Sequence, residues 1–332
     1  MSRIGVLGAG SWGTTLADLL ARNGHQVMLW AYEPEVVESI NSRRENAVYL
    51  PGCRLAEGLN ATGRVAEAVA GFDLVLCATP SHVVRSVLSS AAGAAPREVL
   101  CVSATKGLEP GSLRTASEVI GEVWPGSRVV VLSGPSFALE VFQGQPTAVC
   151  AASRDEEAAR ETQHQFSNAR FRVYWSRDPI GVELGGALKN VIAIAAGILE
   201  GLGLGHNPRA ALITRGLAEI TRLGVAMGAD PMTFAGLAGM GDLVLTATGQ
   251  LSRNRTLGVA LAKGQSLAEY RATHRTVAEG VGTAQAAVAL AARYGVELPI
   301  CQQVSRILFE GKPPAEAVKD LMERALKMEQ WR

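Results

Sequence analysis

One short segment near the start of the chain restricts the possible folds more than any other. Residues 8–13 read Gly-Ala-Gly-Ser-Trp-Gly, directly after an apolar run at residues 4–7 and at the start of a helix-like stretch. Glycines at this spacing permit a tight turn, close approach of the backbone to a pyrophosphate, and close packing of a helix on a strand. The helix N-terminus then offers N–H donors and a positive dipole end to the phosphates. With Glu33 placed 20 residues after Gly13, the segment predicts a dinucleotide-binding unit.

Apolar runs and helix-like stretches alternate through the first half of the chain. Continuous apolar strands separated by helices predict a parallel sheet that is covered on both faces. The expected strands lie at residues 4–7, 26–30, 74–78, 99–102, 129–132, 148–152 and 171–174. Helices are expected at residues 14–22 and 35–43, among others.

The pattern changes near residue 178. Asp178-Pro179, Asn207-Pro208 and Asp230-Pro231 each place a capping residue before a proline suited to the first turn of a helix. Beyond this point apolar residues mostly recur at spacings of three and four, which indicates helices. We therefore expect an α/β fold with an N-terminal Rossmann-type dinucleotide-binding domain at residues 1–178. An all-α substrate domain is expected at residues 179–332.

Composition argues against several classes of function. The 332 residues include 32 Lys and Arg against 31 Asp and Glu, so no charge excess favours nucleic acid or a membrane surface. Five cysteines without CxxC spacing fit neither a disulfide framework nor a zinc site, which agrees with a reducing cytoplasm. The most apolar long stretch, residues 191–204, contains Glu200, closely follows Lys189, and is too short and too charged to span a bilayer. We expect a cytoplasmic protein without a metal, a nucleic-acid partner or membrane insertion.

Polar or glycine-bearing loops follow the later strands of the expected sheet, at the edge where open parallel sheets bind ligands. Lys106, in the loop Ser103-Ala104-Thr105-Lys106-Gly107, therefore stands where an anionic substrate or cofactor can reach it. His82 also lies in such a loop. It is either a general base or, as we favour, a histidine that caps or hydrogen-bonds its own loop.

A lysine surrounded by small residues lies near the start of the helical half. Helical geometry places Gly185 and Gly186 at i−4 and i−3 from Lys189, and Ala193 at i+4. We interpret this face as bare, so that a small substrate can approach a single ammonium group. Partial burial lowers the pKa of a lysine towards a range useful for proton transfer. Lys189 is therefore the candidate catalytic residue, and an ordinary solvent-exposed helix lysine is the alternative.

Ser252-Arg253-Asn254 precedes another expected helix. Hydroxyl, guanidinium and amide donors at a helix N-terminus suit a phosphate monoester, because an arginine can engage two oxygens at once. A simple helix cap with a solvated arginine is the alternative. Asp242, within Gly239-Met240-Gly241-Asp242-Leu243, is a cap unless other site residues lie beside it.

A series of segments, in order and at family-like spacing, resembles the bacterial NAD(P)-dependent glycerol-3-phosphate dehydrogenases. The resemblance covers nearly the whole chain. The matching segments are residues 8–13, Ser133-Gly134-Pro135-Ser136-Phe137-Ala138, Glu183-Leu184-Gly185-Gly186-Ala187-Leu188-Lys189-Asn190, Gly239-Met240-Gly241-Asp242-Leu243, Ser252-Arg253-Asn254 and Glu279-Gly280.

The resemblance implies reversible reduction of dihydroxyacetone phosphate to sn-glycerol 3-phosphate with NAD(P)H, which supplies glycerol 3-phosphate for phospholipid synthesis. Lys189 matches the proton donor and acceptor for the C2 oxygen. Positions that contact the phosphorylated substrate match Lys106, Gly134, Ser136, Lys189, Asp242, Ser252, Arg253 and Asn254. The expected NAD(H) or NADP(H) site comprises Gly8, Gly10, Ser11, Trp12, Gly13, Tyr32, Lys106, Ala138, Arg253, Val277 and Glu279. A homodimer is also expected.

One segment departs from the pattern of family members that use NADPH, which often place an arginine after the second strand. This chain has Tyr32 and Glu33 there. Glu33 would oppose a 2′-phosphate but could accept a hydrogen bond from the ribose 2′-hydroxyl of NADH. Arg43 or Arg44 could fold back towards a 2′-phosphate instead. We expect NADH to be used at least as well as NADPH.

Two other interpretations remain open. The first is a related two-domain ketopantoate or 3-hydroxyacid reductase. Ser252-Arg253-Asn254 argues against it, because this segment favours a phosphorylated substrate. The second is a dinucleotide sensor without catalytic activity, against which the set of Lys106, Lys189 and Asp242 speaks.

Overall fold

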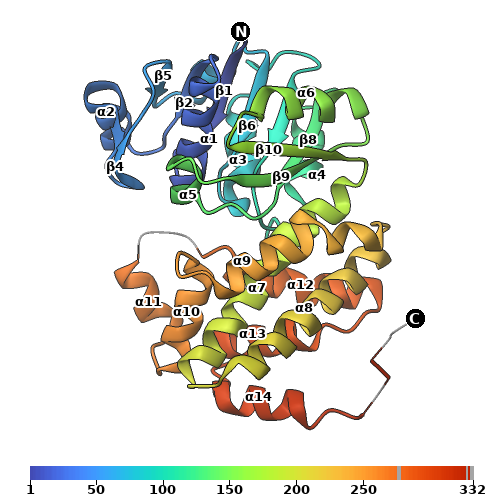
Figure 1. The fold of residues 1–332 in the computed structure, drawn as a ribbon. Coiled ribbons are helices and arrows are strands. Elements are labelled where there is room, and N and C mark those ends of the chain that lie inside the picture. The colour runs from blue at the N-terminus through green and yellow to red at the C-terminus, as the bar shows by residue number, and fades with distance from the viewer. Residues whose placement is uncertain (275–277, 327, 330–332) are drawn as a thin grey trace.

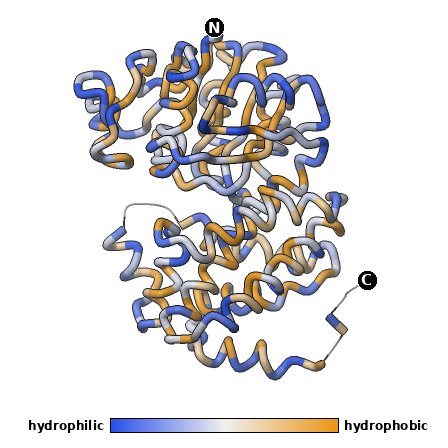
Figure 2. The backbone as a smooth tube through the Cα atoms, viewed as in Figure 1, coloured by the Kyte–Doolittle hydropathy of each residue, from blue (hydrophilic) through white to orange (hydrophobic). Residues whose placement is uncertain are grey.

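The structure is a computed structural model that describes residues 1–274, 278–326 and 328–329. A sheet with helices around it forms one end of the molecule, and helices alone form the other (Figure 1). In Figure 2 the strands are mostly hydrophobic, whereas the loops at the outer end of the sheet are mostly hydrophilic. The division into an α/β domain and a helical domain confirms the expected fold class.

The main sheet has eight strands in the order β10-β9-β8-β7-β6-β1-β2-β5. These strands are β1 (Arg3–Leu7), β2 (Gln26–Trp30), β5 (Leu59–Thr62), β6 (Leu74–Cys77), β7 (Leu100–Ser103), β8 (Arg128–Ser133), β9 (Thr147–Ala152) and β10 (Phe171–Ser176). β1 lies between β2 and β6 and is parallel to both, with Val6 opposite Leu29 on one side and Leu76 on the other. The chain therefore extends the sheet in opposite directions from β1, and open sheets bind ligands at such a switch point.

Helices cover both faces of this sheet. They are α1 (Ser11–Arg22), α2 (Pro34–Arg43), α3 (Val84–Ser90), α4 (Ala116–Val123), α5 (Ala138–Phe142) and α6 (Glu156–Phe166), with short 3-10 turns η1 (Val65–Ala68) and η2 (Ser81–Val83). Successive residues of a strand point to opposite faces. Val6 accordingly belongs to the buried cluster that contains Leu16 of α1, and Leu7 to the cluster that contains Ile120 of α4.

The expectation of a wholly parallel sheet was wrong for β9 and β10. β9 runs antiparallel to β8 and pairs Ala151 with Leu132, and β10 is parallel to β9. A strand's composition does not encode its direction, which depends on the connection before it. Here that connection contains only the five-residue α5 and returns the chain beside β8 without a crossover. Three further strands were missed: β5, and the antiparallel pair β3 (Glu45–Asn46) and β4 (Leu50–Arg54). Pro51 and Gly52 within β4 are residues that strands usually avoid.

The helical domain contains α7 (Pro179–Gly201), α8 (His206–Ala226), α9 (Asp242–Thr248), α10 (Arg253–Ala262), α11 (Leu267–Thr273), α12 (Gly280–Tyr294), α13 (Pro299–Phe309) and α14 (Pro314–Met322). A 3-10 turn, η3 (Pro231–Ala235), and a π-helical turn, η4 (Leu237–Gly241), precede α9. Asp178 caps α7 as predicted, because its carboxylate accepts a hydrogen bond from Gly181 N. Asn207 does not cap α8, which already begins at His206, although Pro208 does lie in the first turn.

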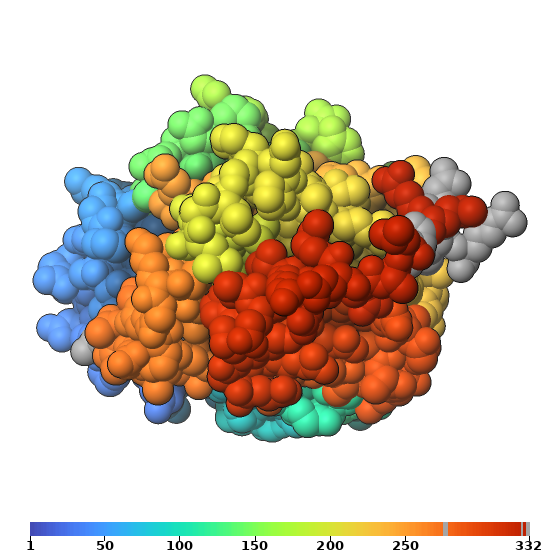
Figure 3. Space-filling view, turned by 90° about the horizontal axis from the view of Figure 1, so that it is seen from below, coloured from blue at the N-terminus to red at the C-terminus, as the bar shows by residue number. Residues whose placement is uncertain are grey.

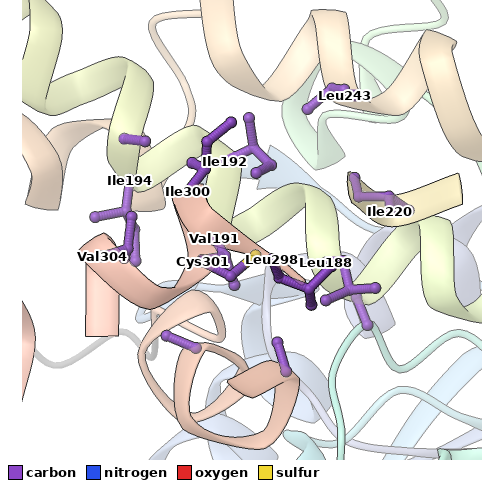
Figure 4. Close-up of a cluster of buried hydrophobic side chains, with 14 of the residues drawn as sticks. Leu188, Val191, Ile192, Ile194, Ile220, Leu243, Leu298, Ile300, Cys301 and Val304 are labelled. Atoms are coloured by element: carbon purple, nitrogen blue, oxygen red, sulfur yellow. The ribbon is translucent and has the colours of Figure 1, made fainter. Parts of the chain in front are cut away.

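α7 forms the core of the helical domain. Its residues Leu188, Val191, Ile192 and Ile194 belong to one buried cluster with residues of α8, α9 and α13 (Figure 4). By length and composition α7 could cross a membrane, unlike the shorter stretch that the sequence indicated, but 94% of its apolar window is buried inside the protein. Seen from below, the outer face of the domain is covered by the yellow α8, the orange segments around α10 and α11, and the red C-terminal helices (Figure 3).

Candidate functional site

The glycine turn after β1 has the geometry that its sequence predicts. Gly8 has φ +111°, and a Cβ there would lie 2.8 Å from Ala78 O. A Cβ on Gly13 would lie 1.9 Å from Gly8 O, so this position must remain a glycine for α1 to pack on the turn. A Cβ on Gly10 would meet nothing within 4 Å, and no side chain caps the helix at this residue. The space beside Gly10 is therefore open, and no side chain takes the place at the start of α1 that a helix N-terminus offers to a phosphate.

Trp12 supplies a second sign of a ligand site. Its indole Nε1–H is buried and has no hydrogen-bond partner among the described residues. Buried donors are nearly always paired in folded proteins, so an acceptor brought by a ligand would complete this one. The ring also lies 5.9 Å from Lys106 Nζ, which places the glycine turn beside the loop after β7. These features fit a dinucleotide.

Lys106 connects the two domains. Its Nζ donates to Gly134 O at 2.9 Å, to Ser136 Oγ at 3.4 Å and to Asp242 Oδ2 at 2.8 Å. Gly134 has φ +148°, and a Cβ there would lie 2.8 Å from Val149 Cα. The structure thus brings together Lys106, Gly134, Ser136 and Asp242, which are four of the residues predicted to bind substrate.

Lys189 lies in the middle of α7 and is only 6% exposed. Its Nζ donates to Asp242 Oδ1 at 2.5 Å and to Thr246 Oγ1 at 2.8 Å. Asp242 is fully buried, and its two oxygens bridge the ammonium groups of Lys189 and Lys106. Asp242 does not cap α9, whose N-cap position is Gly241; its carboxylate lies between the two candidate lysines instead.

The glycines before Lys189 have a different purpose from the one predicted. A Cβ on Gly185 would lie 2.5 Å from Ala238 O in η4, and one on Gly186 would lie 2.4 Å from Ser133 Oγ. The interpretation of a face left bare for substrate was therefore wrong. These glycines admit neighbouring parts of the protein, and the close approach of η4 to α7 brings Asp242 to Lys189.

Burial lowers the pKa of Lys189 from its ordinary value to about 7, and the positive charge of Lys106 acts in the same direction while Asp242 opposes both. A lysine with this pKa exists in both protonation states at neutral pH. It can therefore donate a proton in one direction of a reaction and accept it in the other.

A chain of amide hydrogen bonds crosses the site. Asn190 Nδ2 donates to Lys106 O at 3.1 Å, Asn254 Nδ2 donates to Asn190 Oδ1 at 2.9 Å, and Gly280 N donates to Asn254 Oδ1 at 3.0 Å. Beside it, Glu279 accepts from Ser81 Oγ at 2.7 Å and from Ser81 N at 3.2 Å, and its burial raises its pKa. The N-terminus of α12 is thereby fixed to α7, α10 and the loop after β6.

Ser252 caps the start of α10, where the sequence predicts a phosphate site. Ser252 Oγ accepts from Arg255 N at 3.2 Å, and its hydroxyl proton can still be donated to a ligand. Arg253 is exposed at the first position of the helix. Desolvation by the nearby protein lowers its pKa, an effect that Glu279 and Tyr270 oppose, and a guanidinium remains protonated under these conditions.

The end of β2 was the expected place for the adenosine ribose. Tyr32 is 82% exposed there, and Glu33 Oε1 accepts from Tyr49 Oη at 2.6 Å. Arg43 donates to Ser39 Oγ on its own helix at 3.1 Å, and Arg44 donates to Leu59 O of β5 at 2.5 Å, so both arginines already have partners within the α/β domain.

The remaining predicted residues are distributed as follows. Ser11 begins α1, and Ala138 begins α5, where its carbonyl accepts from Thr15 Oγ1 at 3.2 Å. Val277 lies outside the described residues. His82 lines a hollow of about 410 Å³ that also borders Glu279 and Tyr270. No cluster of His, Cys, Asp and Glu that could hold a metal ion occurs among the described residues.

Sequence reasoning missed three residues in direct contact with the site: Thr246, Asn190 and Ser81. Thr246 could have been found, because it lies four residues after Asp242 on one helix face. Asn190 and Ser81 make contacts with residues distant in sequence, and no local pattern predicts such contacts.

Comparisons with known proteins agree with this geometry. Two family models match, described as the N-terminus and the C-terminus of NAD-dependent glycerol-3-phosphate dehydrogenase, over residues 3–159 and 178–319. A protein of Geobacter sp. strain M21, named glycerol-3-phosphate dehydrogenase (NAD(P)+), is 56% identical over 330 residues, which are 98% of each chain.

Solved structures extend the comparison. A crystal structure of a glycerol-3-phosphate dehydrogenase from Coxiella burnetii has a TM-score of 0.94 and 41% identity, and the match covers 97% of this chain and 99% of that one. A ketopantoate reductase from Ralstonia eutropha has a TM-score of 0.61 at 17% identity, and the match covers 95% of this chain and 99% of that one. The second likeness concerns the fold alone.

Proposed function

Because the chain belongs to the NAD-dependent glycerol-3-phosphate dehydrogenase family, we propose that it catalyses the reversible reduction of dihydroxyacetone phosphate to sn-glycerol 3-phosphate with NAD(P)H. The proposal rests mainly on the buried contact between Lys189, Asp242 and Lys106, which combines residues of both domains. It supplies a proton donor with a pKa near neutrality and a second cation for an anionic substrate.

Separate residues serve proton transfer, charge stabilisation and phosphate binding. A bound nicotinamide supplies the hydride for C2 of the substrate. Lys189 protonates the C2 oxygen in reduction and takes the proton back in oxidation, and Lys106 stabilises negative charge beside it. Asp242 orients both ammonium groups through its two oxygens. Arg253 holds the phosphate with Ser252 and Asn254 at the N-terminus of the ten-residue α10.

The other assignments are part of the same proposal. Substrate is held by Lys106, Gly134, Ser136, Lys189, Asp242, Ser252, Arg253 and Asn254. NAD(H) or NADP(H) is held by Gly8, Gly10, Ser11, Trp12, Gly13, Tyr32, Lys106, Ala138, Arg253, Val277 and Glu279. The domain boundary lies between residues 178 and 179, where α7 begins. The enzyme works as a cytoplasmic homodimer on a small phosphorylated substrate and supplies the glycerol 3-phosphate for phospholipid synthesis.

The function is tested by initial rates of NADH and NADPH oxidation with dihydroxyacetone phosphate, ketopantoate and 3-oxoacids as separate substrates. We expect turnover with dihydroxyacetone phosphate and little with the unphosphorylated compounds, because Arg253 then has no phosphate to bind. A preference for ketopantoate would support the related reductase, which the 17% identity of its solved relative does not favour. Cofactor binding without turnover of any substrate would support the non-catalytic sensor.

The two directions of the reaction should show mirrored pH profiles. Reduction needs Lys189 protonated, so kcat/KM for dihydroxyacetone phosphate should be constant below about pH 7 and fall about tenfold per unit above it. Oxidation of glycerol 3-phosphate needs the neutral amine, so its kcat/KM should instead fall below that pH. Profiles measured at constant ionic strength test this. If kcat/KM for reduction falls only near pH 10.5, the ordinary pKa of a lysine, the proton donor is not a buried lysine.

Cofactor choice follows from the end of β2. We expect kcat/KM with NADH to be at least equal to that with NADPH, because Tyr32 offers no cation and Glu33 is oriented by Tyr49. Tyr32→Arg should shift the ratio towards NADPH by adding a charge beside the 2′-phosphate. Tyr174→Arg is the matched control, since it adds the same charge at an exposed tyrosine on the distant strand β10. A strong NADPH preference of the unmodified enzyme would contradict the prediction.

A further inference from the structure

Glu183 is a buried carboxylate that the proposed chemistry does not use. It lies in the second turn of α7 and is 2% exposed. Its Oε1 accepts from Ser117 N at 2.8 Å, and its Oε2 accepts from Ser117 Oγ at 2.5 Å. Ser117 belongs to the first turn of α4, which Thr115 and Glu118 close with a capping box. A side chain of the helical domain therefore holds the N-terminus of a helix in the α/β domain.

This contact lies on a defined face of α7. Glu183, Gly186 and Asn190 follow one another at i, i+3 and i+7, which is one stripe of a helix. All three contact the α/β domain: Glu183 at Ser117, Gly186 at Ser133, and Asn190 at the carbonyl of Lys106. Lys189 points instead to Asp242 and Thr246 on α9. The height and rotation of α7 against the α/β domain thus determine where Lys189 lies relative to Lys106.

Of these three contacts, only that of Glu183 consists of two charge-assisted hydrogen bonds to a single residue. Gly186 contributes only close packing, and the amide of Asn190 makes a single neutral bond to Lys106. The described contacts of the Glu183 carboxylate are hydrogen-bond donors without a full positive charge, and the nearest other charged group on α4, Glu118, is also acidic. Burying a carboxylate in this way costs free energy, so the contact adds little to the stability of the fold. Its main effect is to fix the position of α7 relative to α4.

We propose that Glu183 is a positioning residue that sets α7 against the α/β domain so that Lys106 and Lys189 share Asp242. The inference rests on the proposed dehydrogenase function. It assigns Glu183 an effect on the proton-transfer step at a distance, since misplacement of a reacting group by about 1 Å can lower a rate substantially.

Three substitutions test the proposal. Glu183→Ala removes both hydrogen bonds. Glu183→Gln can keep them, because its amide oxygen accepts from Ser117 N and its amino group donates to Ser117 Oγ. Glu183→Asp keeps the charge but shortens the side chain, so either the bonds are lost or α7 moves towards α4. The Glu183→Asp variant remains informative if Glu183→Ala does not fold.

Glu219→Ala is the matched control. Glu219 is also a buried carboxylate at a helix N-terminus, where it accepts from Ile300 N at 2.7 Å and from Cys301 N at 3.3 Å. Both partners belong to α13, so this contact lies wholly within the helical domain. Loss of Glu219 should lower the melting temperature without changing the relation between Lys106 and Lys189.

For each variant we would measure the melting temperature, kcat and KM with dihydroxyacetone phosphate, cofactor affinity, and the pH profile of reduction. Glu183→Ala and Glu183→Asp should lower kcat about tenfold with little change in cofactor affinity. The alkaline fall in their pH profile of reduction should move to higher pH. Lys106, whose charge lowers the pKa of Lys189, then lies farther from Lys189. Glu183→Gln should stay within about twofold of the unmodified enzyme, and Glu219→Ala should keep its kcat and pH profile.

Two results would overturn the inference while leaving the proposed function intact. One is a lowered melting temperature with unchanged kcat and pH limb in Glu183→Asp, as in Glu219→Ala. The other is a Glu183→Gln variant as impaired as Glu183→Ala. Absence of turnover by the unmodified enzyme would refute the proposed function itself.

Discussion

Replacing Lys189 with methionine should lower kcat for dihydroxyacetone phosphate reduction by at least about 100-fold, the lower range for loss of a general acid or base. Methionine has a similar length and is apolar, so it suits a position that is 6% exposed among buried neighbours. Asp242 keeps its ion pair with Lys106, so the remaining charges of the site stay balanced. Cofactor affinity should change little, because the glycine turn and Trp12 lie in the other domain.

Lys263→Met is the matched control, since Lys263 follows α10 and is exposed. Both variants should bind NADH with normal affinity in a fluorescence titration, and only Lys189→Met should lose turnover. The alkaline limb of the reduction profile should also disappear from any residual activity of Lys189→Met. A kcat close to normal would remove Lys189 from the catalytic role.

Local patterns predicted much of the fold because local interactions determine those parts. The glycine turn at residues 8–13 is specified by steric limits that act within a few residues, as the Cβ positions of Gly8 and Gly13 show. The cap at Asp178 and the proline after it likewise predicted the start of α7. The apolar runs located most strands of the main sheet, since a strand covered on both faces must be apolar along its length.

Features set by contacts between distant segments could not be predicted in the same way. The direction of β9 depends on how its connection packs, and the small strands β3 and β4 pair with each other without a buried apolar run. The environment of Lys189 depends on η4, which begins almost 50 residues later in the chain. The sequence indicated that Gly185 and Gly186 matter but not what occupies the space beside them, which is protein.

Recognition of the substrate phosphate should depend most on Arg253. Arg253→Ala should raise KM for dihydroxyacetone phosphate roughly ten- to a hundredfold, because losing a hydrogen bond to a charged group costs about 1.5–3 kcal/mol. The melting temperature should hardly change, since the side chain is exposed and Ser252 still caps α10. Because Arg253 is also a proposed cofactor contact, KM for NADH is measured separately.

Arg255→Ala provides the contrasting control two residues along the same helix. Arg255 forms an ion pair with Glu200 and donates to Gly249 O at 3.0 Å, so its loss removes contacts within the helical domain. We expect Arg255→Ala to lower the melting temperature and to change KM less than Arg253→Ala does. Substrates that differ only in their phosphate group separate the two effects, because Arg253→Ala should remove most of the discrimination between a phosphate ester and its unphosphorylated analogue. If that discrimination persists in Arg253→Ala, the phosphate is bound by other residues, and the assignment of the α10 N-terminus as the phosphate site is wrong.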